Sequence, residues 1–121
     1  MTEKVTIEYH ENLPMPLIYL SSIRDLARWQ VDQLKWAYEQ GYRELTLSFF
    51  DTTPMGFDIA RAASVVINAV MDFLRDHPDI AHLTILCGDT VPQPLITALS
   101  QYEKSAEAQN ISHNIKQGDN L

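Results

Sequence analysis

Residue types that could carry chemistry gather in two short segments, each of which follows a run of apolar residues. Residues 51–57 combine an aspartate, two threonines and a glycine, and residues 87–91 combine a cysteine, a glycine and an aspartate. Carboxylates can act as general bases or bind cations, and glycine backbones can approach a phosphate closely. If the preceding runs are parallel strands, both segments lie at the sheet edge where α/β proteins bind ligands. The candidate binding residues are Asp51, Thr52, Thr53, Met55, Gly56, Phe57, Gly88 and Asp89.

Asp51 and Cys87 each have a catalytic and a structural interpretation. Asp51 could be a general base or a metal ligand, but an aspartate in such a loop more often accepts a hydrogen bond from its own turn, and we favour that role. Cys87 would need a lowered pKa to act as a nucleophile, whereas a thiol that ends an apolar run is more often a small buried hydrophobe. We therefore name no catalytic residue.

Histidine and cysteine usage gives no sign of a metal centre. The single cysteine excludes an intrachain disulfide and a zinc site built from thiolates. Since the histidines show no metal-ligand spacing, we predict no metal and no cofactor. The histidines are His10, His77, His82 and His113.

Length and charge narrow the class of protein. The chain has 121 residues, which fits one domain, and its formal net charge of −7 argues against nucleic acid as a partner, because nucleic-acid binders need a basic patch. No apolar stretch approaches the roughly 20 residues of a membrane span, so we expect no membrane partner. The polar first residues do not resemble a signal peptide, and we expect a cytoplasmic protein.

Hydrophobic periodicity alternates between strand-like and helical segments. A first helix begins after Ser21 or Ser22 and ends near Gln40, and a second is capped by Asp58 and ends near His77. This alternation predicts an α/β fold, a three-layer α/β/α sandwich with a mostly parallel sheet and right-handed crossovers. The predicted strands cover residues 5–10, 17–20, 45–50 and 83–87, a shorter third helix covers 95–102, the domain covers 1–103, and 104–121 form a flexible polar tail.

The segment that follows the third predicted strand resembles the phosphate loop of macrodomains, the ADP-ribose-binding modules. Residues 51–58 read Asp-Thr-Thr-Pro-Met-Gly-Phe-Asp, where the family has a loop of the type Ser-Thr-Gly-x-Tyr-Gly-Phe-Pro. The helix opening with two alanines at 62–63, the Asn-Leu-Pro turn at 12–14 and the helix end at 72–78 are also similar. The resemblance spans residues 5–102, matches the C-terminal half of the family, and implies binding of ADP-ribose or a related nucleotide.

Several departures from the family pattern weaken the implied site. Thr53 and Met55 stand where the family has a glycine and an aromatic residue, and Cys87 stands where an aromatic residue packs on adenosine. Thr53 disfavours a positive φ, Pro54 lacks an N–H donor, and Asp51 adds a negative charge beside a phosphate. The N-terminal half of the family, which carries residues used for ADP-ribosyl hydrolysis, has no counterpart, so an enzyme is the function that we favour least.

Two tryptophans suggest a second function. Trp29 and Trp36 lie seven residues apart on the first predicted helix, roughly opposite its core-facing stripe. Exposed aromatic pairs usually mark interfaces, although these could instead pack under the N-terminal strand or the C-terminal tail. The sequence thus supports two hypotheses: a degenerate macrodomain-like module with weak nucleotide binding, or a non-catalytic homodimeric or partner-binding protein that uses the Trp29 and Trp36 face.

Overall fold

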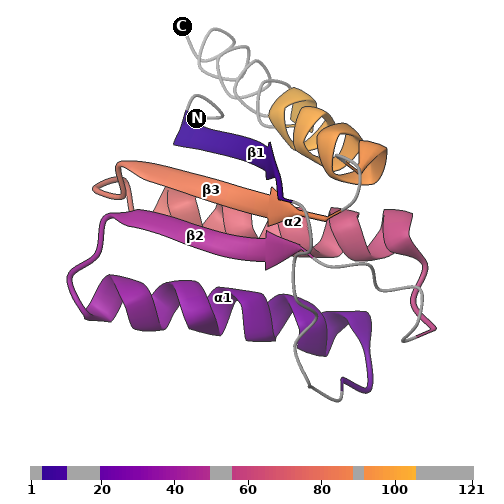
Figure 1. Ribbon diagram of the computed structural model, residues 1–121, viewed down its shortest axis with the longest axis horizontal. Helices are drawn as coiled ribbons and strands as arrows, with labels where there is room; N and C mark the ends of the chain where they lie inside the picture. Colours follow the sequence, from indigo (N-terminus) through magenta and orange to yellow (C-terminus); the bar gives the residue numbers. More distant parts are fainter. Residues whose placement is uncertain (1–3, 11–19, 50–55, 89–91, 106–121) are drawn as a thin grey trace, which may run out of the picture.

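The computed structural model describes residues 4–10, 20–49, 56–88 and 92–105 of the chain. The elements follow the order β1 (Val5–Tyr9), α1 (Ile23–Glu39), β2 (Glu44–Phe49), α2 (Ile59–Asp76) and β3 (His82–Cys87), and a third helix covers residues 93–105 (Figure 1). The predicted α/β class is confirmed. Residues 17–19 of the strand expected at 17–20 and residues 106–121 of the expected tail lie outside the described residues, and the expected boundary at 103 falls inside the third helix.

Both long helices begin at the residues predicted to cap them. The Ser22 hydroxyl accepts a hydrogen bond from the N–H of Asp25 at 3.1 Å, and the Asp58 carboxylate accepts one from the N–H of Arg61 at 3.0 Å. Each cap satisfies a donor that the helix leaves without an intrahelical partner. These polar side chains therefore fix where α1 and α2 start.

The end of α1 is fixed by a glycine. Gly41 has φ +98°, a conformation that residues with a Cβ rarely adopt. Its N–H donates to the carbonyl of Tyr38 at 3.0 Å, and the N–H of Tyr42 donates to the carbonyl of Ala37 at 3.1 Å. This pair of bonds is the Schellman motif, which turns the chain out of the helix and toward β2.

The sheet is parallel, with strand order β1-β3-β2. Ile85 of the central strand pairs in register with Ile7 of β1 and Leu47 of β2. Alternate residues share a face of a strand, so these three side chains lie on one face. That face is the buried one, because Leu47 and Ile85 are almost fully shielded from solvent.

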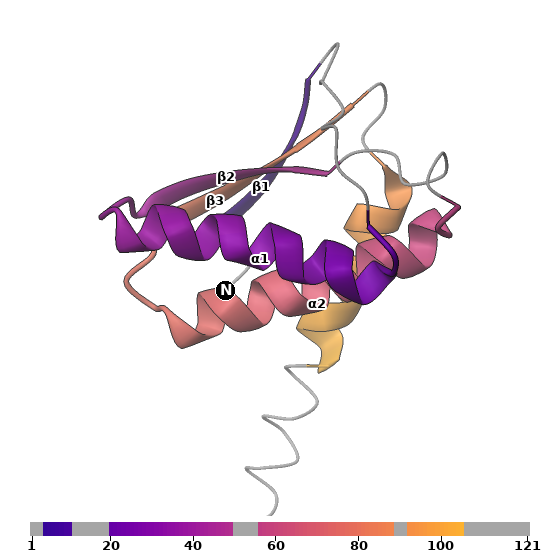
Figure 2. The same ribbon diagram turned by 90° about the horizontal axis from the view of Figure 1, so that it is seen from below.

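All three described helices lie on the same side of the sheet (Figure 2). The opposite face carries the row Thr6, Thr84 and Thr46, in which both edge threonines are exposed. The described residues therefore form two layers, and the third layer that we expected is absent from them. The strands alternate apolar and polar residues, whereas strands covered on both faces are apolar throughout.

The two crossover connections differ in handedness, which corrects the expectation of right-handed crossovers only. The chain passes from β1 to β2 across the sheet and then returns to the central β3, while α1 and α2 lie on one face (Figure 1). With this order, β2–α2–β3 is right-handed and β1–α1–β2 is left-handed. The described sheet has one apolar face, and the apolar stripes of both helices are buried against it (Figure 2).

The core lies between the helices and the sheet. On α1, Leu26 and Gln30 are buried, and Gln30 is only 2% exposed. Its side-chain Nε2 donates to the backbone carbonyl of Ser48 in β2 at 2.8 Å, so the buried amide is paired. The α2 residues that are buried are Ala62, Ala63, Val66, Ile67, Val70, Met71, Phe73 and Leu74.

Candidate functional site

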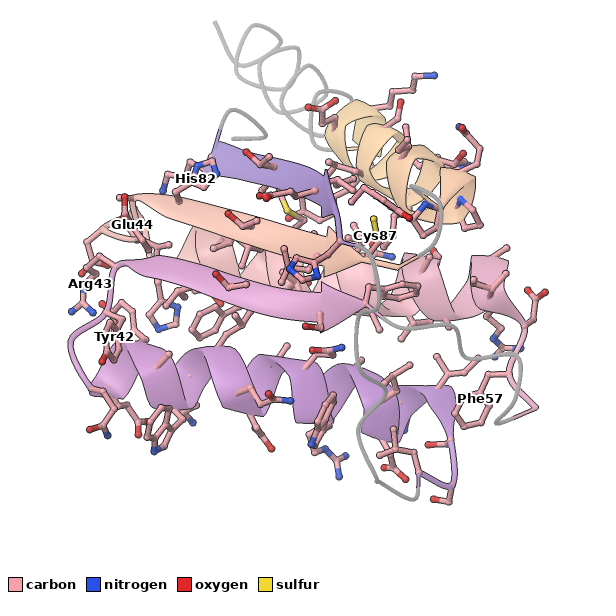
Figure 3. The ribbon with its side chains drawn as sticks, in the orientation of Figure 1. Tyr42, Arg43, Glu44, Phe57, His82 and Cys87 are labelled. Carbon is pink, nitrogen blue, oxygen red and sulfur yellow. The ribbon has the colours of Figure 1, made fainter. Side chains whose placement is uncertain are left out.

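The carboxyl ends of the three strands meet at one edge of the sheet. Phe49 and Cys87, the last residues of β2 and β3, pair in register and are both buried, and Tyr9 of β1 completes the row. The N–H of His10 donates to the carbonyl of Cys87 at 2.9 Å and extends the ladder by one residue. This edge is where the sequence places the candidate site, and in Figure 3 Cys87 and Phe57 both lie on this side of the molecule.

Gly56 has the backbone conformation that a ligand loop needs. Its φ is +84°, and a Cβ built on it would have no heavy atom within 4 Å. The position therefore favours glycine because of its backbone angle and not because of crowding. Gly56 is followed by the half-buried Phe57 and by Asp58, the cap of α2.

The N-terminus of α2 lies on the same side of the molecule as the carboxyl ends of the strands (Figure 1). The cap of Asp58 satisfies the N–H of Arg61, as expected from the sequence. Among the described residues, the N–H groups of Ile59 and Ala60 have no hydrogen-bond partner, which is normal for a first turn. Together with the partial positive charge of the helix end, these donors favour an anion.

Only part of the predicted site lies among the described residues. Gly56 and Phe57 precede α2, and the half-buried Gly88 directly follows β3. The remaining candidates lie outside the described residues: Asp51, Thr52, Thr53, Met55 and Asp89.

Cys87 is a structural residue. It is fully buried, and its Sγ donates a weak hydrogen bond to the carbonyl of Glu8 at 3.6 Å. Burial raises the pKa of the thiol, which disfavours the reactive thiolate. The expectation that Cys87 acts as a small hydrophobe is confirmed.

A cluster of polar and aromatic side chains lies at the opposite end of the sheet, among residues that no sequence motif singles out. The Tyr38 hydroxyl hydrogen-bonds to the carboxylate of Asp79 at 2.9 Å, and Arg43 Nε lies 3.1 Å from the same carboxylate. The guanidinium carbon of Arg43 lies 3.9 Å from the centroid of the Tyr38 ring. The hydrogen bond from Tyr38 and the charge of Arg43 lower the pKa of Asp79, and Asp79 raises the pKa of Tyr38.

This cluster fastens the end of α1 to the end of α2. The His77 ring, just after α2, lies 4.6 Å from the Tyr38 ring and 4.2 Å from the Phe73 ring. His77 Nδ1 lies 2.8 Å from the carbonyl of Phe73, so this nitrogen carries the proton that is donated. Residues from distant parts of the sequence thus form one structural joint that includes His77.

His82 contacts one residue on the open face of the sheet. Its Nε2 lies 2.8 Å from the hydroxyl Oγ1 of Thr6, and Glu44 pairs in register with His82 on the neighbouring strand (Figure 3). No ion pair joins His82 to a carboxylate among the described residues. A hydroxyl and an imidazole without a third orienting group do not make an activated nucleophile.

The described part of the chain contains neither a metal centre nor a membrane span. No group of three or more histidine, cysteine, aspartate or glutamate side chains in it could hold a metal ion. None of its helices is both long enough and apolar enough to pass through a bilayer.

The two tryptophans differ in exposure, which corrects the expectation of an exposed pair. Trp29 is half-buried and packs against the hydrophobic core, whereas Trp36 is 62% exposed. Trp29 therefore contributes to the packing of α1, and the outward apolar surface belongs mainly to Trp36.

These observations define a small α/β protein with a three-stranded parallel sheet and a candidate anion site at its carboxyl edge. No family model matches the chain, and no solved structure matches it. The resemblance to macrodomains accordingly rests on the sequence motifs alone.

Proposed function

We propose that this protein binds ADP-ribose or a related nucleotide, with the diphosphate at the carboxyl edge of β2 and β3. The observation that carries the proposal is the left-handed conformation of Gly56, directly before the N-terminus of α2. A diphosphate needs converging N–H donors, and a left-handed residue beside a helix start is a common way to provide them. Residues 51–63 resemble the phosphate loop and following helix of macrodomains, and this resemblance is the reason for proposing ADP-ribose or a related nucleotide as the ligand.

The same geometry predicts weak binding. Asp58 already pairs with one donor of the first turn, and its carboxylate lies beside the position of the phosphate. A like charge a few ångströms away costs on the order of a few kcal/mol at an effective dielectric constant near 20. Net charge of −7 adds a long-range repulsion for any anion. We therefore expect a dissociation constant well above that of an optimised nucleotide site.

Calorimetric titration with ADP-ribose tests the proposal, and the second left-handed glycine supplies a matched control. Gly41 has φ +98° and, like Gly56, open space around its Cβ position, but it lies at the other end of the sheet. Valine at either position costs on the order of 1–3 kcal/mol in backbone strain. We expect saturable binding in the wild type and in Gly41→Val, and none in Gly56→Val. No heat at millimolar ligand, or equal loss in both variants, would contradict a site at Gly56.

We also propose a second candidate function, a non-catalytic interaction module. The observation that favours it is Trp36, whose ring is 62% exposed on the outer side of α1. Large exposed aromatic side chains are enriched at protein interfaces and carry much of their binding energy. Light scattering at increasing protein concentration measures whether the chain associates with itself, and a constant monomer mass would refute self-association.

A further inference from the structure

The outer side of α1 carries an ordered pattern of charge around Trp36. The helix packs against α2 and β2 through its inner side and lies at the border of the molecule (Figures 1 and 2). Its outer side holds Trp36 together with Arg28, Asp32, Lys35 and Glu39, all of them exposed. We call this set the α1 outer stripe.

The charged side chains of the α1 outer stripe form few ion pairs with other described residues. Arg28 has a side chain that is 67% exposed, and its single ion pair, with Asp25, is 3.9 Å long. Such a pair contributes little stability in water. Asp32, Lys35 and Glu39 have no ion-pair partner among the described residues.

We propose that a second copy of this chain docks on the α1 outer stripe, with the two α1 helices antiparallel about a twofold axis that passes close to Gln33. This inference rests on the second proposed function and specifies its partner. In this arrangement Trp36 of one copy lies opposite Trp29 of the other. The half-buried Trp29 needs only its outward edge for that contact.

Charge complementarity selects the antiparallel arrangement. In it, Arg28 faces Glu39 of the second copy and Asp32 faces Lys35 of the second copy, and each pair occurs twice by symmetry. A parallel pairing would place Arg28, Asp32 and Lys35 opposite their own copies, which is repulsive along the whole helix. The pattern is therefore self-complementary in one orientation only.

The size of the stripe predicts a weak dimer. The 17 residues of α1 span about 25 Å at 1.5 Å per residue, and a Trp side chain buries about 150–250 Å² at most. One helix pair of this length falls at or below the low end of stable protein interfaces, about 1,200 Å² in total. The dimer should accordingly dissociate on dilution.

Sedimentation equilibrium with charge-exchanged variants tests the arrangement. Arg28→Glu and Glu39→Arg each place like charges opposite one another, so we expect each to raise the dimer dissociation constant about tenfold or more. The double variant restores both pairs and should return to within about threefold of the wild type. Trp36→Ala should weaken the dimer about tenfold, whereas Tyr42→Ala removes an aromatic ring that is 60% exposed outside the stripe and should change nothing.

The outcomes separate the two levels of the proposal. A wild type that stays monomeric up to millimolar concentration overturns both self-association and this arrangement. A dimer that tolerates Trp36→Ala, or that the double variant fails to restore, overturns the α1 arrangement alone and leaves self-association standing.

Discussion

The buried amide of Gln30 offers the sharpest test of how α1 is held on the sheet. Gln30 is 2% exposed and donates to the carbonyl of Ser48 at 2.8 Å. Replacement by methionine keeps the length of the side chain but leaves that carbonyl without this donor. An unsatisfied buried carbonyl costs about 1–3 kcal/mol, and the more apolar side chain offsets part of this cost. We therefore expect Gln30→Met to lower the free energy of unfolding by about 1–2 kcal/mol.

Gln30→Glu makes the same test depend on pH. A protonated carboxyl can donate to the Ser48 carbonyl, whereas a carboxylate can only accept and is also desolvated. The folded pKa of the new glutamate should therefore be raised above its unfolded value of about 4.3. Its stability relative to the wild type is then highest below about pH 4 and falls as the pH rises through the raised pKa, by about 1.4 kcal/mol for each pKa unit.

Urea unfolding of wild type, Gln30→Met and Gln30→Glu at a series of pH values measures these differences. The comparison at each pH removes the acid sensitivity that all three proteins share. A Gln30→Met protein as stable as the wild type would refute the reasoning. So would a difference between Gln30→Glu and the wild type that stays constant between pH 4 and 8, because the amide would then not be the donor that pairs with Ser48.

Two further predictions concern the joint at the helix ends and the two faces of the sheet. Because Tyr38 and Arg43 lower the pKa of Asp79 below its ordinary value of 3.8, this contribution to stability is present above that value and is lost as the pH falls through the lowered pKa. Asp79→Asn should therefore flatten the acid limb of a plot of unfolding free energy against pH, and an unchanged limb would exclude this joint. Thr46→Lys, on the open face, should change the free energy of unfolding by about 0.5 kcal/mol or less, whereas Leu47→Lys buries a charge and should prevent folding. Circular dichroism measures whether each variant folds, and equal tolerance of both changes would contradict a sheet with one buried face.

Helix boundaries could be predicted from the sequence because local chemistry determines them. Ser22, Gly41 and Asp58 act within one turn of chain, through a side-chain oxygen or a permissive backbone angle. The long apolar stripe of α2 was predictable for the same reason, since burial follows the period of a helix.

The described residues place helices on one face of the sheet only (Figure 2), and the sequence carries a signal for that arrangement. Residues 45–49 and 83–87 are mostly apolar, yet Thr46 and Ser48 interrupt the first run at every second position, and Thr84 interrupts the second. That period of two indicates a sheet with one buried face. The alternation of apolar and polar residues thus indicates the open face, whereas the high apolar content of the same segments suggests burial.

Contacts between distant residues could not be predicted from the sequence. The joint of Tyr38 and Arg43 with Asp79 joins positions about 40 residues apart, and its members have no pattern until the helices are packed. The partial burial of Trp29 likewise depends on how α1 is rotated on the sheet. Of the ligand site, Gly56 could be recognised from its neighbours, because a glycine before a helix cap is a local signal.

The right-handed and the left-handed crossover belong to two parts of the molecule, and we expect these parts to fold at different times. The right-handed unit of β2, α2 and β3 is continuous in sequence and pairs its strands between positions 38 apart, such as Glu44 and His82, whereas β1 joins the central strand through contacts such as that between Glu8 and Cys87, 79 positions apart. Closing so long a loop is slow and entropically costly. We expect β1 to be the last strand to dock and the first to detach, so its amide protons should exchange with solvent faster than those of β3, and transient opening at this edge would expose the Cys87 thiol without unfolding the rest of the chain.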